Sequence, residues 1–261
     1  MDKRSSHQLQ ERRVWLGFLT HCVKPGTIVE FGCGSGFVLE VLAMNFTDSI
    51  IIGIDKSLER LEQVIRKRLN NIVTVNADIT KKIFLNETLD TCIFVGVLHE
   101  IFSTFGKRQV ETTMRLAGHC VKHNGVLIIQ DFLKPVSQQV KMTFINKDTQ
   151  RRFTRFAHEF YPRKIHYREH KNSVKLDIAD AVEFISKYRS PTEEDWQEEM
   201  EETHFFFTED DFKKIAQQDD FFISEMQKLP SNSERWVEVK QDIEFEFEHD
   251  YHWIQLVLIK R

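Results

Sequence analysis

Short apolar runs alternate with amphipathic segments along the first half of the chain. Between the runs, apolar residues recur at helical spacing, as in residues 57–70 and 106–123. A further amphipathic helix is predicted over residues 8–23. Strands that are apolar throughout and alternate with helices are typical of a parallel sheet covered on both faces. The predicted strands occupy residues 27–31, 49–55, 72–75, 91–97 and 126–129.

The second half has a different pattern, beginning with a charge-segregated stretch from Leu133 to His204. Lys and Arg outnumber Asp and Glu by 11 to 3 in residues 134–175, and acids outnumber bases by 10 to 2 in residues 177–202. So long a segment is not a plain loop of a compact domain, and we predict a helical cap inserted after the fifth strand. Three later stretches are predicted to be strands of the core sheet, the last two antiparallel: residues 221–226, 236–247 and 252–259.

The predicted fold class is therefore α/β, with a doubly wound, mostly parallel seven-stranded sheet, antiparallel C-terminal strands and a helical cap. Residues 1–132 are expected to form the core with its N-terminal helix, residues 133–204 the cap, and residues 205–261 the completion of the core sheet.

A glycine-rich turn follows the first strand. Three of the ten glycines lie in the five residues Gly32-Cys33-Gly34-Ser35-Gly36. Such a turn between a strand and a helix lets the backbone approach a ligand closely. Right-handed crossovers bring the carboxyl ends of all parallel strands to one edge of the sheet, where ligands bind. The residues expected on this edge are Glu30, Asp55, Asp78, residues 96–100 and Asp131.

The acids beside the turn indicate the kind of ligand. Asp55 lies 25 residues after Glu30, at the end of the second strand, where an acid usually binds a ribose diol. That placement suits a dinucleotide or S-adenosylmethionine. A dinucleotide fingerprint needs G-x-G-x-x-G, but here the spacing is G-x-G-x-G, with Phe37 in the place of the last glycine. Glu30 would also repel a pyrophosphate, whereas it suits the ammonium group of a methionine.

Five segments in order resemble the class I S-adenosylmethionine-dependent methyltransferase family. The resemblance covers residues 25–132 and, more loosely, residues 205–261. The matching segments are Val29-Glu30-Phe31-Gly32-Cys33-Gly34-Ser35-Gly36, Ile52-Gly53-Ile54-Asp55, Asn76-Ala77-Asp78-Ile79, residues 89–99 and residues 124–131.

This resemblance implies a Rossmann-like fold, S-adenosyl-L-methionine as cofactor, and a role for each matched position. The methionine part would be held by Glu30, Phe31, Gly32, Cys33, Gly34 and Gly36. The ribose would be bound by Asp55 with Lys56 beside it, the adenine by Asp78 and Ile79, and the sulfonium side would be closed by Gly96 and Val97. For Asp78 a helix cap is the structural alternative.

His99 and Glu100, at the exit of the fourth strand, are the candidate catalytic residues. Methyl transfer from a sulfonium is an in-line displacement that needs alignment and, for an acidic nucleophile, a base. The Leu-His-x pattern here resembles small-molecule O-methyltransferases, so His99 is the candidate base; the alternative is a solvated pair or a helix cap. We expect the acceptor to be an oxygen or nitrogen of a small metabolite or natural-product precursor, whose identity the sequence does not indicate.

The cap is expected to select the acceptor, and two other functions stay open. Aromatic and titratable side chains could line an acceptor pocket: His158, Tyr161, His166, Tyr167, Tyr188 and Trp196. Alternatively, the basic stretch could bind RNA, and residues 205–210 resemble a segment of tRNA 3-methylcytidine methyltransferases. Against this, the opposite charges of the two cap halves favour pairing with each other. The other alternative is a catalytically inactive, cofactor-binding regulatory protein. The basic residues considered for RNA binding are Arg151, Arg152, Arg155, Arg163, Lys164 and Arg168.

Composition restricts the setting. The net charge of −4 gives no overall attraction to nucleic acid or anionic membranes. Four cysteines without a C-x-x-C pair predict reduced thiols in the cytoplasm and no zinc site or other metal site. The polar N-terminus does not resemble a signal peptide, and the apolar run from Cys92 to Leu98 is too short to span a membrane. The oligomeric state is not predicted.

Overall fold

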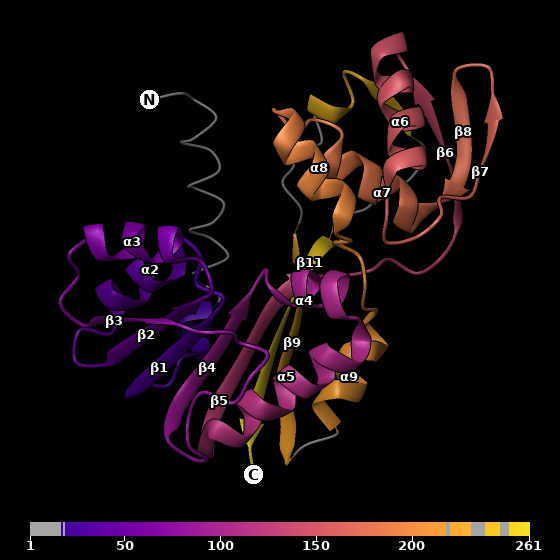
Figure 1. Ribbon diagram of the computed structural model, residues 1–261. Coiled ribbons are helices and arrows are strands. Elements are labelled where there is room, and N and C mark those ends of the chain that lie inside the picture. The colour runs from indigo at the N-terminus through magenta and orange to yellow at the C-terminus, as the bar shows by residue number, and fades with distance from the viewer. Residues whose placement is uncertain (1–16, 18, 218–219, 231–237, 246–250) are drawn as a thin grey trace.

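The computed structural model describes residues 17, 19–217, 220–230, 238–245 and 251–261. Of the helix predicted over residues 8–23, residues 17 and 19–23 fall within this part; residues 17 and 19–22 are helical and residue 23 is not. A seven-stranded core sheet occupies the lower part of Figure 1, and a second, smaller layer of sheet and helices lies above it.

The core sheet has the strand order β3-β2-β1-β4-β5-β11-β9. The first five strands in this order run parallel to one another, and β11 runs antiparallel to both β5 and β9. The prediction of a mostly parallel seven-stranded sheet with antiparallel C-terminal strands is confirmed. The strands are β1 (Thr27–Phe31), β2 (Ile50–Asp55), β3 (Ile72–Asn76), β4 (Leu89–Val95), β5 (Val121–Phe132), β9 (Phe221–Pro230) and β11 (Tyr251–Lys260).

Alternate residues of the central strands are buried on opposite faces of the sheet. In β1, for example, Ile28 belongs to one apolar cluster and Val29 to another, as the two-residue period of a strand requires. Helices α2 (Phe37–Asn45) and α3 (Leu58–Arg66) cover the first face, and α4 (Leu98–Phe105), α5 (Lys107–Cys120) and α9 (Glu209–Gln217) cover the second. Burial on both faces explains why these strands are apolar throughout.

The exit of β4 differs from the prediction. The predicted strand over residues 91–97 ends at Val95, and the separate helix α4 precedes α5. Gly106 divides the two helices with a φ of 79°, a conformation that glycine adopts without a steric cost. The side chain of His99 therefore lies in the first turn of a helix rather than on a strand or loop.

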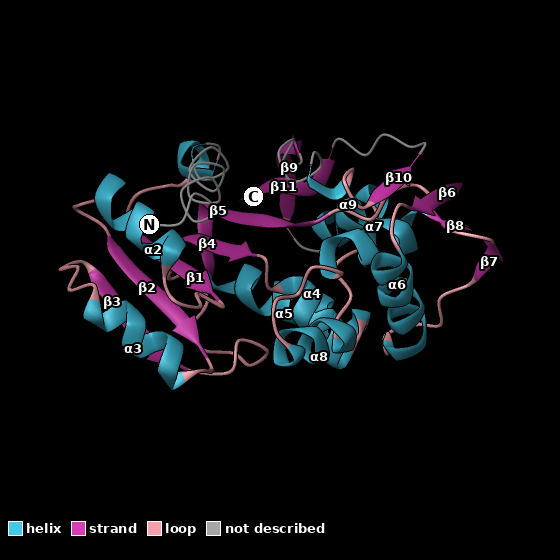
Figure 2. Ribbon diagram, turned by 90° about the horizontal axis from the view of Figure 1, so that it is seen from above, coloured by secondary structure: helices cyan, strands magenta, loops and turns pink. Residues whose placement is uncertain are grey.

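The cap is a mixed α/β layer, so the prediction of a helical cap is wrong. It contains an antiparallel sheet with the order β10-β6-β8-β7, which lies at the right of Figure 2. Buried and exposed positions alternate here as they do in a strand. Val140, Met142 and Phe144 of β6 are buried, and the lysines between the buried positions of β6 and β8 face outward. Its elements are β6 (Gln139–Phe144), α6 (Lys147–Glu159), β7 (Tyr167–His170), β8 (Ser173–Asp177), α7 (Ile178–Lys187), α8 (Glu193–Glu201) and β10 (Ile243–Phe245).

The last segment, residues 205–261, was predicted to complete the core sheet alone, but it is shared between the core and the cap. Residues 236–247 were expected to form a strand of the core, but Ile243–Phe245 pairs with β6 of the cap, and Val239 and Ile243 lie in the apolar core of the cap. Residues 236–237 and 246–247 lie outside the described residues. Residues 205–261 therefore contribute to both layers.

Charged residues of the cap pair across its basic and acidic halves, as predicted. Arg155 bonds to Glu159 and to Glu193, with an Nη1 to Oε2 distance of 2.9 Å in the second pair. Arg163 contacts Asp180 at 2.9 Å and Glu183 at 3.4 Å. These pairs join α6 and the segment that follows it to α7 and α8.

Two observations bear on the setting of the protein. None of the described helices has the length and apolar character needed to cross a membrane. All four cysteines are free thiols, and three of them, Cys33, Cys92 and Cys120, are buried.

The cap has an aromatic core that can be tested by mutation. Phe184 of α7 is fully buried among Phe144, Phe153 and Phe156. We expect Phe184→Ala to lower the free energy of unfolding by about 3–5 kcal/mol, because it leaves a cavity that the rings around it cannot fill. Val136→Ala, at a position that is 88% exposed, should change it by less than about 0.5 kcal/mol. Urea unfolding followed by circular dichroism measures both, and equal stabilities would contradict this packing.

Candidate functional site

The glycine turn is held against the second strand. The amides of Gly32 and Cys33 both donate to the carbonyl of Ile54, at 2.8 and 2.9 Å. A Cβ added to Gly36, which begins α2 with a φ of 75°, would lie 2.7 Å from Cγ2 of Val64. By contrast, a Cβ at Gly34, with a φ of 51°, would meet no atom within 4 Å. Packing therefore demands a glycine at Gly36, whereas at Gly34 the missing side chain leaves open space beside the backbone.

Asp55 ends β2 next to this turn. Its Oδ2 accepts the amide of Gly34 and its Oδ1 accepts the amide of Ser57, each at 2.8 Å. Ser57 in turn caps α3 by accepting the amide of Arg60. A carboxylate has about four acceptor positions, so Asp55 can shape the turn and still accept hydroxyl groups of a ligand.

Glu30, at the end of β1, has an unsatisfied oxygen. The residue is 2% exposed, and within the described part of the chain its Oε2 has no hydrogen-bond partner. Burial and the neighbouring Asp55 raise the pKa of Glu30 well above its usual value. An orphaned buried oxygen is uncommon in native proteins, and it indicates that a donor from a ligand completes the site.

Asp78 follows β3 in an exposed turn. Its Oδ1 accepts the amide and the hydroxyl of Thr80, at 2.9 and 2.7 Å, and these bonds lower the pKa of Asp78. No helix begins here, so the helix-cap alternative for Asp78 is wrong. Lys56 is exposed at the end of β2, and Ile79 is partly buried against the core.

The exit of β4 lies against the glycine turn. A Cβ at Gly32 would lie 2.5 Å from Cγ2 of Val97, so these two segments are in direct contact. Gly96, with a φ of 60°, donates its amide to the carbonyl of Gln130 at 2.8 Å. A Cβ there would lie 3.1 Å from the ring of Trp253.

These features fit S-adenosylmethionine. The turn offers an open approach at Gly34, Glu30 offers an unpaired carboxyl oxygen for an ammonium group, and Asp55 keeps acceptor capacity for a ribose. The fold brings Glu30, Asp55, the glycine turn and Val97 to one edge of the sheet, as expected, and Asp78 lies at the end of the adjoining strand β3.

His99 forms a buried pair with Asp131 at the same edge. Its Nδ1 lies 2.8 Å from Oδ1 of Asp131, which is fully buried at the end of β5. Asp131 also accepts the amides of Leu98 and Phe132, each at 2.8 Å. The carboxylate thus fixes both the first turn of α4 and the orientation of the ring of His99, and it leaves Nε2 for other partners.

The charges around His99 are mostly negative. Burial lowers the pKa of His99, but Asp131, with smaller contributions from Glu202 and Glu100, outweighs burial and raises it to about 9. Burial also raises the pKa of Glu100, and Glu202 adds to this while His99 opposes it.

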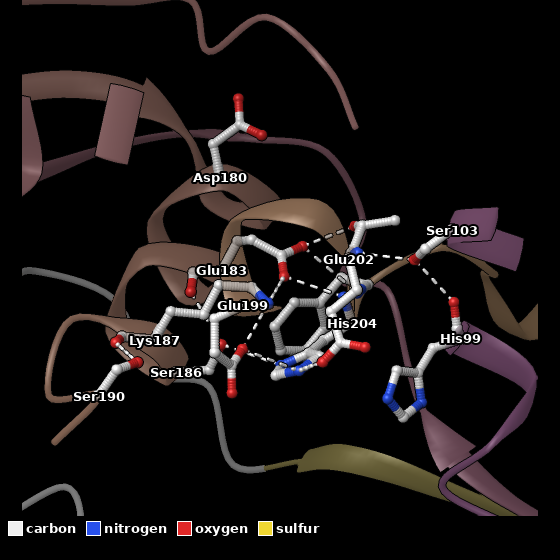
Figure 3. A network of polar contacts seen from close by, with 12 residues as sticks. His99, Ser103, Asp180, Glu183, Ser186, Lys187, Ser190, Glu199, Glu202 and His204 are labelled. Carbon is white, nitrogen blue, oxygen red and sulfur yellow. Dashed lines mark hydrogen bonds and ion pairs between the residues drawn. The ribbon is translucent and has the colours of Figure 1, made fainter. Parts of the chain in front are cut away.

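Sequence reasoning missed two residues that face His99, namely Glu202 and His204 (Figure 3). The rings of His99 and His204 are 5.2 Å apart and nearly perpendicular. Nε2 of His204 lies 3.4 Å from Oε1 of Glu202. No local pattern marks these residues, because they follow α8 and lie about a hundred positions from His99 along the chain.

Buried polar contacts hold this segment in place. Glu183 of α7 is fully buried and accepts the hydroxyl of Thr203 at 2.7 Å and the amide of His204 at 2.9 Å. The amide of Thr203 donates to Oγ of Ser103 at 2.8 Å, and that hydroxyl donates to the carbonyl of His99 at 2.7 Å. The cap and α4 are therefore joined directly beside the two histidines.

Aromatic rings line the junction between core and cap. Phe132 stacks on His204 with 4.3 Å between ring centroids and lies 4.5 Å from Trp253. The cap residues that were expected to line a pocket do not gather here, so that prediction is wrong. Tyr188 and Trp196 are buried in the apolar core of the cap, while His158, Tyr161, His166 and Tyr167 are exposed.

Comparison with known proteins assigns the family. Residues 6–225 match the model of a methyltransferase domain family, so the chain belongs to this family. The chain is an S-adenosylmethionine-dependent methyltransferase of class I, and its cofactor is S-adenosyl-L-methionine. No curated protein sequence matches the chain.

Solved structures share the fold at low sequence identity. The YcgJ protein from Bacillus subtilis is 13% identical with a TM-score of 0.56, over 94% of this chain and 97% of that chain. An S-adenosylmethionine-dependent methyltransferase from Mesorhizobium loti has the same identity and TM-score, over 92% and 93%. The [4+2]-cyclase SpnF is 12% identical with a TM-score of 0.57, over 94% and 79%.

The open space at Gly34 can be tested with a matched control. We expect Gly34→Ala to weaken binding of S-adenosylhomocysteine at least about tenfold, because the methyl group occupies the approach to the turn. Gly106→Ala, between α4 and α5, is the control, with a positive φ and equally open surroundings. Both changes should lower stability, Gly106→Ala the more because its φ of 79° and ψ of 176° suit almost only glycine, but Gly106→Ala should leave binding unchanged. Isothermal titration calorimetry measures the affinity, and equal affinities in the two variants would refute the assignment.

Proposed function

We propose that the protein transfers the methyl group to an oxygen or nitrogen of a small metabolite or natural-product precursor bound between core and cap. The observation that carries this proposal is the buried His99–Asp131 pair, with a 2.8 Å bond through Nδ1. A histidine oriented in this way presents Nε2 to a bound acceptor.

His99 is proposed as the base for an acceptor that must lose a proton. S-adenosylmethionine supplies a methyl group that is already activated by its sulfonium. As the acceptor heteroatom bonds to the methyl carbon, the carbon–sulfur bond breaks and the acceptor proton passes to Nε2 of neutral His99, a form that the pKa of about 9 makes scarce below that pH. Asp131 keeps Nδ1 engaged, so that the proton-accepting nitrogen faces the acceptor. Glu100 adjoins His99 in the first turn of α4 and contributes negative charge beside it.

The cofactor contacts are proposed residue by residue. The orphaned Oε2 of Glu30 accepts from the ammonium group, and the backbone from Phe31 to Gly36 surrounds the methionine part. Asp55 accepts the ribose hydroxyls beside Lys56, and Asp78 and Ile79 contact the adenine. Gly96 and Val97 close the sulfonium side, where Val97 contacts the glycine turn.

The contacts of the cap favour a small acceptor over RNA. Four of the six basic residues considered for RNA are engaged within the cap. Arg155 and Arg163 form the ion pairs described above, Arg151 pairs with Asp148, and Arg152 donates to the carbonyls of Tyr188 and Ser190 while lying over Trp196. An engaged arginine has less capacity to neutralise phosphates.

A cytoplasmic location stays a prediction.

The role of His99 leads to a direct test. We expect His99→Gln to lower turnover by about 10²- to 10⁴-fold and to leave the affinity for S-adenosylhomocysteine within about twofold. His119→Gln, at an exposed histidine of α5, is the control and should change neither quantity. Full turnover of His99→Gln would return His99 to a structural role.

The acceptor class is tested with a radiolabelled methyl donor. Metabolite extract and total RNA are incubated separately with the protein, and the labelled fraction is identified. We expect label in a small molecule and none in RNA. Label in RNA alone, with binding that weakens steeply between about 50 and 200 mM salt, would replace this proposal by the RNA alternative.

A further inference from the structure

We propose that His99, Glu202 and His204 form a binding site for a divalent transition-metal ion, with Zn²⁺ as the best match, at the junction between core and cap. The metal site is inferred from the geometry of these side chains, and only the catalytic role of the ion rests on the proposed function.

The three side chains converge although they come from distant parts of the chain. His99 lies in the first turn of α4, and Glu202 and His204 lie in the segment that leaves α8. One ligand atom from each lies within 4.8 Å of the others. In Figure 3 the carboxylate of Glu202 lies between the rings of His204 and His99. Two imidazoles and one carboxylate, two of the three residues buried, are a ligand set typical of Zn²⁺ and related ions.

The distances suit an ion of this size. Zn²⁺ holds nitrogen and carboxylate oxygen at about 2.0–2.2 Å, so two ligand atoms of a tetrahedral site stand about 3.4 Å apart. Nε2 of His204 and Oε1 of Glu202 are separated by 3.4 Å. Closing the whole set onto an ion requires an inward movement of about 1 Å. Glu202 is only partly buried, and its side chain is long enough to make this movement.

Both histidines are oriented as metal ligands are. A ligating histidine usually bonds through its other ring nitrogen to a protein group, which fixes the ring. Nδ1 of His99 lies 2.8 Å from Asp131, and Nδ1 of His204 lies 3.2 Å from Oγ of Ser186. In both rings Nε2 is therefore the nitrogen directed to the cluster. Among the described residues, no hydrogen bond reaches Nε2 of His99.

A second carboxylate near the cluster is engaged elsewhere. Oε2 of Glu199 lies 3.4 Å from Nε2 of His204, but it accepts from the buried ammonium of Lys187 at 2.7 Å. Lys187 also lies 3.5 Å from Glu183. These contacts leave Glu202 as the carboxylate available to an ion.

An ion here deepens the proposed chemistry. Three protein ligands leave a position for water or a substrate atom, and one of the ligand rings, His204, stacks on Phe132, which lies 4.5 Å from Trp253. An ion held here would lower the pKa of a bound acceptor hydroxyl, whose proton would pass to solvent water. The oxygen–methyl bond then forms as the carbon–sulfur bond breaks. In this state Nε2 of His99 is a ligand, so the ion replaces His99 as the group that activates the acceptor.

Zinc binding by the full-length protein tests the site. Protein is stripped with a chelator, dialysed and titrated with ZnCl₂ in a calorimeter. We expect one Zn²⁺ per chain in the wild type and at least about tenfold weaker binding in Glu202→Gln. Glu201→Gln, at the exposed neighbour on α8, is the matched control and should bind as the wild type does. A wild type that binds no Zn²⁺, or equal affinities in all three proteins, would overturn the inference.

Co²⁺ shows whether the core histidine takes part. The visible absorption bands of Co²⁺ in a nitrogen and oxygen site should appear in the wild type and be lost in His99→Gln. Unchanged bands in that variant would place the ion elsewhere and overturn the site. The Co²⁺ bands of Glu202→Gln are a second test, because Glu202 is partly exposed and its substitution leaves the His99–Asp131 bond intact.

The same samples separate this inference from the proposed function. If chelator-treated protein methylates a small acceptor at the full rate, an ion at this site is not needed, so its catalytic consequence fails while the proposed function stands. If Zn²⁺ binds as expected but only RNA is methylated, the proposed function fails and the metal site stands.

Discussion

The hydrogen bond between Asp131 and His99 connects the core sheet to the junction with the cap. Asp131 is the last acid of β5, and it is fully buried, so its charge requires partners. It finds them in the amides that begin α4 and in the ring of His99. The same carboxylate thus determines where α4 starts, how β4 leaves the sheet and which nitrogen of His99 remains open. The placement of Val97 against the glycine turn depends on that same exit, since Val97 directly precedes the helix.

In the cap, Glu183 has a comparable role. A buried carboxylate is costly to desolvate, but here it accepts from Thr203 and His204 and lies near Lys187 and Arg163. These contacts hold the segment after α8 against α4. The junction between two layers with separate apolar cores is therefore held on both sides, because each layer presents a histidine from a position fixed by a buried acid.

Local signals allowed the cofactor side to be predicted from the sequence. The turn from Gly32 to Gly36 and the acid Asp55 lie next to strands whose apolar runs are unambiguous, and the parallel topology places them together. The cap was harder to predict. Val140, Met142 and Phe144 alternate as a strand requires, but the basic residues around them resembled a charged helical surface, and β10 joins them from a hundred residues away. His204 and Glu202 belong to no local motif, because they become candidate site residues only when the fold brings them next to His99.

SpnF, a [4+2]-cyclase, has a similar fold. A seven-stranded sheet of this kind supports different chemistry, so the glycine turn by itself specifies the donor and not the reaction. What this chain adds is a junction where imidazoles, a carboxylate and the rings of Phe132 and Trp253 meet above Gly96. The cap supplies two of these five groups, Glu202 and His204, and three of its basic side chains, Arg151, Arg155 and Arg163, pair with acids of the cap. The cap therefore reaches the junction with the core through the segment after α8 rather than through its charged outer surface.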